Sequence, residues 1–347
     1  MKGLQLFPNM GTKIQKEEEF YDKNFMMSYS GLNKLLYSPR LFYLHYVLGQ
    51  RDDSTDKFAI EGKLIHCLFL NPDDFDKEFV LSVNDIPSDN PKEVLQRLFN
   101  HFKELNASGD PRIHLEHFEH AILDILKDMN LYQSLKTDAQ RIEKIINEKH
   151  VSYWEYLKKA EGKVIVDPTV YEQCSAVVEE IKTNDYVMKV MGYRPDFEQD
   201  LKVQNEIELA AFDKKYPLFG LRGFVDNLVI DNTNKIIFVN DLKKSSKDIG
   251  SFTESIEYYR YWMQASMYYM LVYNVYLSKP QYSDYTFEFR FIVIDNYMQI
   301  APIKVSEETL EKWVIKTQEL LDQAHYHFDT RCFDLPYQFI INKELIL

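Results

Sequence analysis

The sequence has few cysteines, few glycines and prolines, no long apolar run and a deficit of positive charge. Only three of its 347 residues are cysteine, and they stand far apart with no CxxC pair. This spacing excludes a zinc site or a cysteine-ligated iron–sulfur cluster and favours a reducing cytoplasm. Glycine and proline number 11 and 12, too few for a disordered or collagen-like chain. No apolar stretch approaches the roughly 20 residues that span a bilayer, so we expect neither a membrane segment nor secretion.

The charge balance is acidic, with a net charge of −13. Nucleic acid repels such a chain unless basic residues gather locally or a divalent metal offsets the charge. Aromatic residues make up 14% of the sequence, and large rings either fill a core or stack on bases. At roughly 150 residues per domain, the length corresponds to two domains or to one core with a large insertion.

The hydrophobic periodicity divides the chain into four parts. Residues 1–25 are polar and indicate a loose arm, and residues 26–84 carry the N-terminal helices of the core. Several amphipathic helices over residues 85–190 indicate a helical insertion. In residues 191–347 the period changes to that of strands: three strands, a helix at about 253–277, two more strands and a helix at about 307–328. We therefore expect an α/β protein with a mixed central sheet flanked by helices.

Two carboxylates, Asp226 and Asp241, interrupt strongly apolar strands. A buried carboxylate is costly unless it has a partner or a metal. The turn sequence DNTN at 231–234 lies between them and predicts an antiparallel hairpin. A loop centred on this turn pairs Asp226 with Val239, and so sets Asp226 diagonally to Asp241 on the face that also carries Lys243. Two carboxylates at this spacing reach one hard cation such as Mg²⁺.

A metal between two carboxylates, with a lysine two residues further on, suits the hydrolysis of a phosphodiester. The metal neutralises the phosphate and activates a water, while the ammonium of Lys243 orients that water or stabilises developing charge. Residues 220–250 carry five basic and four acidic residues, and this stretch tolerates a phosphate backbone. On the next helix, Gln264 and Tyr268 share a face and can hydrogen-bond a phosphate or a terminal base. Each residue also has a structural explanation, as a buried hydrogen-bonded carboxylate or as helix packing.

Together these motifs resemble the PD-(D/E)XK nuclease superfamily, in its branch of RecB-type nuclease domains, lambda exonuclease and exonuclease VIII. The order of motifs in that branch is a helical His, GxxD, D/ExK after a turn, and QxxxY on the following helix. Here they read GKLIHCLFL with His66, GFVD with Asp226, DLK with Asp241 and Lys243, and QASMY with Gln264 and Tyr268. The branch often has a further acid one strand earlier, where Glu206 is the better match and Glu208 its rival.

The resemblance implies a restriction-endonuclease-like core and a set of roles. His66, Asp226, Asp241 and the carbonyl of Leu242 would ligate Mg²⁺ or Mn²⁺. Lys243 would act on the attacking water, and Gln264 and Tyr268 would support the site and the DNA. The relatives that carry an iron–sulfur cluster have a Cys ahead of Pro-Arg; Ser38 stands there in this chain, so no cluster is expected. Local positive charge places Arg222, Lys244 and Lys247 as contacts to nucleic acid.

We therefore expect a metal-dependent DNA exonuclease that processes ends in recombination or repair, with a phage gene as one source. Its partners would be DNA and, by analogy with ring-forming relatives, a second copy of the chain or a recombination protein. A non-catalytic nuclease-fold module that binds DNA or docks on a partner is the alternative, and so is a nuclease that acts on RNA or nucleotides. The complete set of Asp226, Asp241 and Lys243 favours catalysis over the non-catalytic module.

Overall fold

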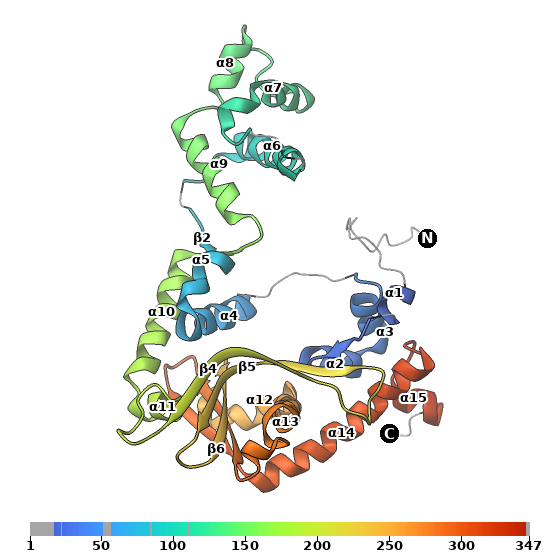
Figure 1. Ribbon diagram of the computed structural model, residues 1–347. Helices are drawn as coiled ribbons and strands as arrows, with labels where there is room; N and C mark the ends of the chain where they lie inside the picture. The colour runs from blue at the N-terminus through green and yellow to red at the C-terminus, as the bar shows by residue number, and fades with distance from the viewer. Residues whose placement is uncertain are drawn as a thin grey trace. The chain divides into compact units, whose positions relative to one another are not determined.

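The computed structural model describes residues 17–21, 23–50, 57–83, 85–107, 109 and 112–344. It divides into two compact units (Figure 1): residues 72–174 form the smaller unit, and the other described residues form the larger one. The boundaries differ from those expected for a helical insertion at 85–190. The smaller unit begins earlier because the segment after residue 78 forms a strand within it. It ends earlier, at residue 174, and the carbonyls of Val190 and Met191 accept hydrogen bonds from the sheet of the larger unit.

The larger unit is built on one mixed, six-stranded sheet. Strand β5 lies next to the edge strand β4 and pairs with it, antiparallel, along almost its whole length. On its other edge, β5 pairs first with the short parallel strand β1 and then with the antiparallel strand β6. Strand β7 runs parallel to β6, and β8 closes the sheet antiparallel to β7. The strands are β1 (Met26–Met27), β4 (Leu201–Ala211), β5 (Gly220–Asp231), β6 (Ile236–Lys244), β7 (Thr286–Ile294) and β8 (Ile300–Val305).

Helices flank this sheet, as the sequence predicts. The parallel pair β6–β7 requires a crossover, which α12 and α13 supply. Helices α13 and α14 pack on each other and share one hydrophobic core with the sheet. The helical elements of the unit are α1 (Glu17–Tyr21), α2 (Tyr29–Tyr37), α3 (Pro39–Phe42), η1 (Tyr43–Val47), α4 (Lys57–Leu70), α11 (Asp185–Val190), η4 (Ile249–Ser251), α12 (Phe252–Tyr258), α13 (Tyr261–Val272), η5 (Tyr273–Leu277), η6 (Pro280–Tyr282), α14 (Glu307–Thr330) and α15 (Tyr337–Asn342).

The hairpin between β5 and β6 forms, but its predicted register is wrong. Asp231 pairs with Ile236 as the last rung, and Leu228, rather than Asp226, pairs with Val239. The cause is the side chain of Asp231, whose Oδ1 accepts hydrogen bonds from the backbone N–H groups of Thr233 (3.0 Å) and Asn234 (2.8 Å). This Asx-type cap keeps Asp231 in the strand and moves the turn to residues 232–235. Extended to residue 226, the observed register sets Asp226 opposite Asp241.

The expected helix at 253–277 is interrupted. Helix α12 ends at Tyr258 and α13 begins at Tyr261, because Arg260 takes a left-handed conformation with φ of 57°. Partners from α2 hold this break. The hydroxyl of Tyr29 donates to the carbonyl of Tyr259, and the guanidinium of Arg260 donates to Asn33. The break brings the first turn of α2 to the start of α13.

The N-terminal arm expected at 1–25 falls largely outside the described residues. Its described part includes helix α1, whose Phe20 is buried against Phe25 and Phe328. Residues 17–21 therefore belong to the core of the larger unit. Within the described part of the chain, no helix combines the length and the apolar character that crossing a membrane requires.

The smaller unit is mainly helical. Its core surrounds Trp154, which is fully buried, contacts the rings of Phe99, Phe102 and Phe118, and donates from Nε1 to the carbonyl of Ile113 (3.0 Å). Its elements are η2 (Pro72–Asp74), α5 (Phe75–Glu78), β2 (Phe79–Leu81), α6 (Asp89–Ala107), η3 (Leu115–Phe118), α7 (Glu119–Asp128), α8 (Asp138–Glu143), α9 (Glu148–Ala160), β3 (Val164–Val166), which pairs in parallel with β2, and α10 (Pro168–Thr183), which contains the boundary between the units.

Candidate active site

The candidate site lies where strands β5 and β6 separate. Their pairing ends at Asn227 and Asn240, so Asp226 and Asp241 stand just beyond the last rung. The backbone N–H of Leu242 then donates to Oδ2 of Asp226 (2.7 Å) instead of to a neighbouring strand. A carboxylate thus takes the place of a ladder carbonyl, which fixes Asp226 at the opening of the sheet.

Helix α4 brings His66 to this opening. Its Nε2 lies 3.1 Å from the carbonyl oxygen of Leu242, and its Nδ1 lies 3.5 Å from Glu206 Oε1 and 3.7 Å from Asp226 Oδ2. One ligand atom from each of His66, Glu206 and Asp226 lies within 4.8 Å of the others. Helix α4 and the strands β4 and β5 therefore meet around one small volume.

Glu206 reaches the cluster through an unusual backbone. It lies opposite Asp226 between two regular rungs of the β4–β5 ladder, but it takes φ of 46° and makes no rung itself. A left-handed conformation at a non-glycine residue costs on the order of 1–3 kcal/mol and is typical of functional sites. Its Oε1 is buried and forms no hydrogen bond of regular geometry, with His66 Nδ1 3.5 Å away. The rival residue, Glu208, is exposed, pairs with Phe224 in the ladder, and is not among the residues whose ligand atoms gather with His66.

Asp241 and Lys243 form a buried ion pair at the end of β6. Asp241 is fully buried, neither of its carboxylate oxygens has a geometrically regular hydrogen bond, and Oδ2 contacts the Lys243 ammonium. The Nζ of Lys243 also lies 4.9 Å from the ring centre of Tyr261, which adds a cation–π contact. The Lys243 ammonium thus contacts both Asp241 and the Tyr261 ring, and the Lys243 side chain is only 13% exposed.

Burial and crowding shift the pKa values of this set. Burial raises the pKa of Asp241 to about 6; Lys243 opposes this shift and Asp226 adds to it. Burial likewise raises the pKa of Asp226, against the effect of His66 and Lys243. Burial alone would lower the pKa values of His66 and Lys243, but the neighbouring carboxylates outweigh it, so that the pKa of His66 rises to about 9 and that of Lys243 also rises. Without a metal, the two cations are therefore what balances the carboxylates.

Gln264 and Tyr268 lie behind the site and hold its backbone. The Tyr268 hydroxyl donates to the carbonyl of Phe224, and Gln264 Nε2 donates to that hydroxyl (2.9 Å). Tyr268 is 5% exposed. A Cβ at Gly223 would come within 2.8 Å of the Tyr268 ring, so glycine is what allows this close approach. The geometry gives both residues a positioning role for the strand that carries Asp226.

The basic residues expected to contact nucleic acid are engaged within the protein. Lys247 pairs with Glu254 (2.6 Å), and Lys244 donates to the carbonyl of Asp295 (3.2 Å). Arg222 is half-buried on β5, opposite Ala210. The structure does not gather these three into the cluster around Asp226.

Asparagines form a second polar row one residue away from the acids. Asn205, Asn227 and Asn240 occupy adjacent rungs of β4, β5 and β6. Asn240 Nδ2 donates to Asn227 Oδ1 (2.7 Å), and Asn227 Nδ2 donates to Asn205 Oδ1 (3.1 Å). The row also donates to the carbonyls of Val190, Met191 and Leu70, the last residue of α4. It thereby ties the helix that carries His66 to the strands that carry the acids.

Sequence reasoning missed this row and two tyrosines. Tyr29 and Tyr261 lie close to Asp241: burial raises the pKa of Tyr29, and Tyr261 and Asp241 raise it further. Nothing local in the sequence marks these tyrosines, because they reach the site from separate helices. The asparagines did leave a signal, since each stands next to an acid in an apolar strand, as Asn205-Glu206, Asp226-Asn227 and Asn240-Asp241.

The fold and the site define a nuclease of a known class. The family model of the PD-(D/E)XK nuclease superfamily matches residues 26–335, and the chain therefore belongs to this superfamily. This membership confirms the expected restriction-endonuclease-like α/β fold, and the superfamily is one of nucleases, which hydrolyse phosphodiesters. The RecB-type branch stays a prediction.

Two solved structures are similar to the chain at low identity. One is a candidate exonuclease from Eubacterium rectale, with 12% identity, a TM-score of 0.46, and coverage of 99% of this chain and 95% of the other. The second is SSO0001, with 14% identity, a TM-score of 0.24, and coverage of 56% and 79%. No curated protein matches the chain.

The residues at the site fit a divalent cation. Carboxylate oxygens and an imidazole nitrogen are ligands that Mg²⁺, Mn²⁺ and similar ions accept in proteins. Asp241 Oδ1 is buried without a hydrogen-bond donor, and Glu206 Oε1 forms no hydrogen bond of regular geometry, so both oxygens are available to such an ion.

Proposed function

We propose that this protein is a divalent-metal-dependent deoxyribonuclease, and specifically an exonuclease that processes DNA ends in recombination or repair. The observation that carries the proposal is the convergence of Glu206, Asp226 and Asp241 with His66 and Lys243 at the opening between β5 and β6. A structural role alone does not account for Asp241 Oδ1, which is buried without a hydrogen-bond donor, since folding normally satisfies such an atom.

His66, Asp226, Asp241 and the Leu242 carbonyl would hold the ion, with Glu206 as a further ligand. Mg²⁺ or Mn²⁺ supplies neutralisation of the phosphate and a more acidic water when it is bound. Asp226 also keeps its bond from the Leu242 N–H, which fixes the orientation of that carboxylate before substrate arrives. Because the fold already holds this carboxylate in place, no free energy is needed to reorient it during the reaction.

Lys243 acts as a charged hydrogen-bond donor. Its raised pKa keeps it protonated at neutral pH, so it does not remove a proton from water in the resting site. From its place beside Asp241 it donates to the attacking water or to a non-bridging phosphate oxygen, where negative charge develops. Asp241 keeps the ammonium in place, and the Tyr261 ring covers one side of it.

An exposed aromatic ring beside the site supports a nucleic-acid substrate. Phe224 lies two residues before Asp226 and is 52% exposed. A base can stack on such a ring without regard to sequence. The preference for DNA over RNA and for ends over internal positions comes from the resemblance of the motifs to the RecB-type branch.

The proposal is tested by digestion of linear and covalently closed duplex DNA with Mg²⁺ or Mn²⁺, next to an EDTA control and the Lys243→Met protein. We expect loss of the linear DNA alone, and only with metal and intact Lys243. Cleavage of both DNAs would identify an endonuclease, and cleavage of RNA alone would change the substrate class. Cleavage of no nucleic acid would favour the non-catalytic binding module.

Metal binding is measured separately, by calorimetry with Mn²⁺ in the absence of DNA. We expect binding to the wild-type protein and to the surface variant Glu319→Gln, and strongly weakened binding to His66→Ala and Asp226→Asn. Equal binding to all four proteins would place the ion elsewhere. This readout does not depend on the identity of the substrate.

A further inference from the structure

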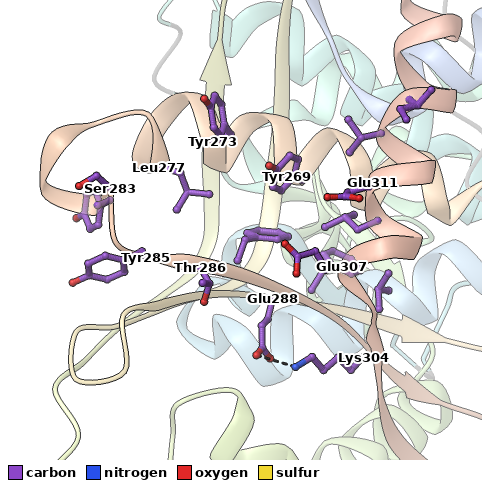
Figure 2. A pocket seen from close by; sticks show the side chains of 17 residues that line it. Tyr269, Tyr273, Leu277, Ser283, Tyr285, Thr286, Glu288, Lys304, Glu307 and Glu311 are labelled. Atoms are coloured by element: carbon purple, nitrogen blue, oxygen red, sulfur yellow. Dashed lines mark ion pairs between the residues drawn. The ribbon is translucent and has the colours of Figure 1, made fainter.

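A second concave site lies at the other end of the sheet from the acids. A cavity of about 800 Å³ opens between the end of α13, the start of β7 and the first turns of α14 (Figure 2). Its strand residues, Thr286 to Phe289, pair with residues 236–239 of β6, whereas Asp241 and Lys243 pair with residues near the end of β7. A ligand in this cavity therefore has no need to enter the candidate active site.

Aromatic rings form much of the cavity wall. Tyr269 and Tyr273 line it from α13 and η5, and Tyr285 lines it from the loop before β7 (Figure 2). The Tyr269 ring packs edge-on against Phe287 (5.2 Å between ring centres), while Tyr273 is 49% exposed. These rings are held in place by the core and still present surface to a ligand.

Two carboxylates at the rim have no basic partner within the described part of the chain. Glu307 and Glu311 lie one turn apart on α14, and Figure 2 shows both beside Tyr269. Burial and then the neighbouring Tyr273 raise the pKa of Tyr269, and Glu311 and Glu307 raise it further, which indicates that their charge reaches the ring. Lys304 also lines the cavity but pairs with Glu288 (2.8 Å). The cavity is therefore negative as well as aromatic.

The concave surface continues past the first cavity. A second hollow of about 510 Å³ shares Tyr269, Tyr273 and Val314 with it and reaches Phe212, which is 57% exposed. The two hollows adjoin at these shared residues between α13 and α14, and we call them together the groove; their combined volume exceeds what a single side chain or a small cation needs. A peptide segment fits such a groove better than an isolated ion does.

We propose that this groove binds a basic, arginine-bearing segment of a partner protein, with an arginine side chain in the cavity. A guanidinium stacks on tyrosine rings and pairs with carboxylates in the same orientation, and it does so better than an ammonium. The net charge of −13 steers a basic partner toward the chain and repels phosphate groups from this groove. A partner bound here leaves the opening at Asp226 free for a substrate.

The test uses a synthetic pentapeptide, acetyl-Leu-Arg-Leu-Arg-Leu-amide, and its counterpart with citrulline in place of arginine. Calorimetric titration of the full chain at about 150 mM salt keeps non-specific attraction small. We expect the arginine peptide to bind at least about tenfold more tightly than the citrulline peptide, because citrulline keeps the shape and loses the charge. Equal binding of the two peptides, or no binding of either, would overturn the proposal.

Three variants locate the binding site. Glu311→Gln and Tyr273→Leu should each weaken binding of the arginine peptide by about fivefold, from loss of the carboxylate or of the ring face. Glu319→Gln is the matched control, since it removes the same charge from an exposed position of α14 outside the groove. Equal weakening by Glu319→Gln would show attraction to net charge alone and would refute the site. Nuclease assays on Glu311→Gln should match the wild-type protein, so this test and that of the nuclease fail independently.

Discussion

The asparagine row and the acidic row, which consists of Glu206, Asp226 and Asp241, cross the same three strands one residue apart. The two rows differ in how many of their side-chain polar atoms form hydrogen bonds. Asn205, Asn227 and Asn240 bond to one another and to three backbone carbonyls, and Asn240 Oδ1 is the one side-chain atom of this row recorded without a partner. In the acidic row, Glu206 Oε1 and both oxygens of Asp241 lack a regular hydrogen bond. The hydrogen bonds of the asparagine row are thus nearly complete, whereas the acidic row has carboxylate oxygens that remain able to accept a ligand bond to a cation.

This difference indicates that the asparagine row serves mainly stability and the acidic row mainly activity. A satisfied buried amide network fixes the strands and the end of α4 at one geometry, and loss of any member leaves others unpaired. Like charges held together, in contrast, oppose folding and favour a bound cation. We therefore expect substitutions in the acidic row to affect activity most, and substitutions in the asparagine row to affect stability most.

The largest expected effect is that of Asp241→Asn on cleavage. The substitution keeps the shape but removes the charge that holds Lys243 and a metal, so we expect the cleavage rate to fall by about 10³-fold or more. The measurement is the initial rate on linear duplex DNA, with urea denaturation of the same protein as the check on folding. A rate within tenfold of the wild-type value would remove Asp241 from the reaction.

The reverse pattern is expected for Asn227→Leu. Its side chain is fully buried and takes part in three hydrogen bonds, and leucine would leave Asn205 and Asn240 without their shared partner. We expect the free energy of unfolding to fall by about 3 kcal/mol. Urea denaturation measures this loss. At urea concentrations well below the unfolding midpoint, the affinity of the variant for Mn²⁺ should stay within a few-fold of the wild-type value. Unchanged stability would contradict the assignment of the row as a structural network.

The two rows also differ in how stability depends on pH. In metal-free protein the pKa of His66 is raised from 6.5 to about 9, so its interactions stabilise the fold fully below pH 6.5 and are lost as the pH rises through 9. In EDTA, we expect the stability difference between wild type and His66→Gln to shrink by about 2 kcal/mol between pH 6 and pH 10.

The His66 titration is also measured directly, by NMR of the imidazole. A metal ion binds the neutral imidazole, so Mg²⁺ should lower the pKa of His66. A pKa near 6.5 in EDTA would show that the carboxylates do not act on His66. The asparagines carry no titrating group, and Asn227→Leu should accordingly show no such dependence on pH beyond that of the wild-type protein.

How much of this could be read from the sequence depends on the range of the interactions. The strands and helices follow from local periodicity, and the acids stand out because carboxylates in apolar strands need a reason. The hairpin register was predicted wrongly since the side chain of Asp231 moves the turn by bonding to Thr233 and Asn234. The break at Arg260 depends on contacts with Tyr29 and Asn33, more than 200 residues earlier, and no local pattern encodes it.

The side chains of the candidate site show the same division. His66, Asp226, Asp241 and Lys243 were predicted because their types and order recur in a family. Tyr29 and Tyr261, which flank Asp241, were not, since aromatic residues are common in this chain and most of them fill the core. Tyr268 was predicted from its motif to support the site and the DNA, and the structure places it against Gly223 and the Phe224 carbonyl.

The smallest expected effect concerns this support, which belongs to neither row. Gly223→Ala places a methyl group within 2.8 Å of the Tyr268 ring and should lower the free energy of unfolding by about 2 kcal/mol through overpacking. Tyr268→Leu relieves that crowding but loses the hydroxyl bond to Phe224, so the two changes should be strongly non-additive, with a coupling of about 1 kcal/mol. Urea denaturation of the four proteins in the cycle measures it. Simple additivity would mean that glycine is required here for another reason, and that Tyr268 positions Asp226 without contact at Gly223.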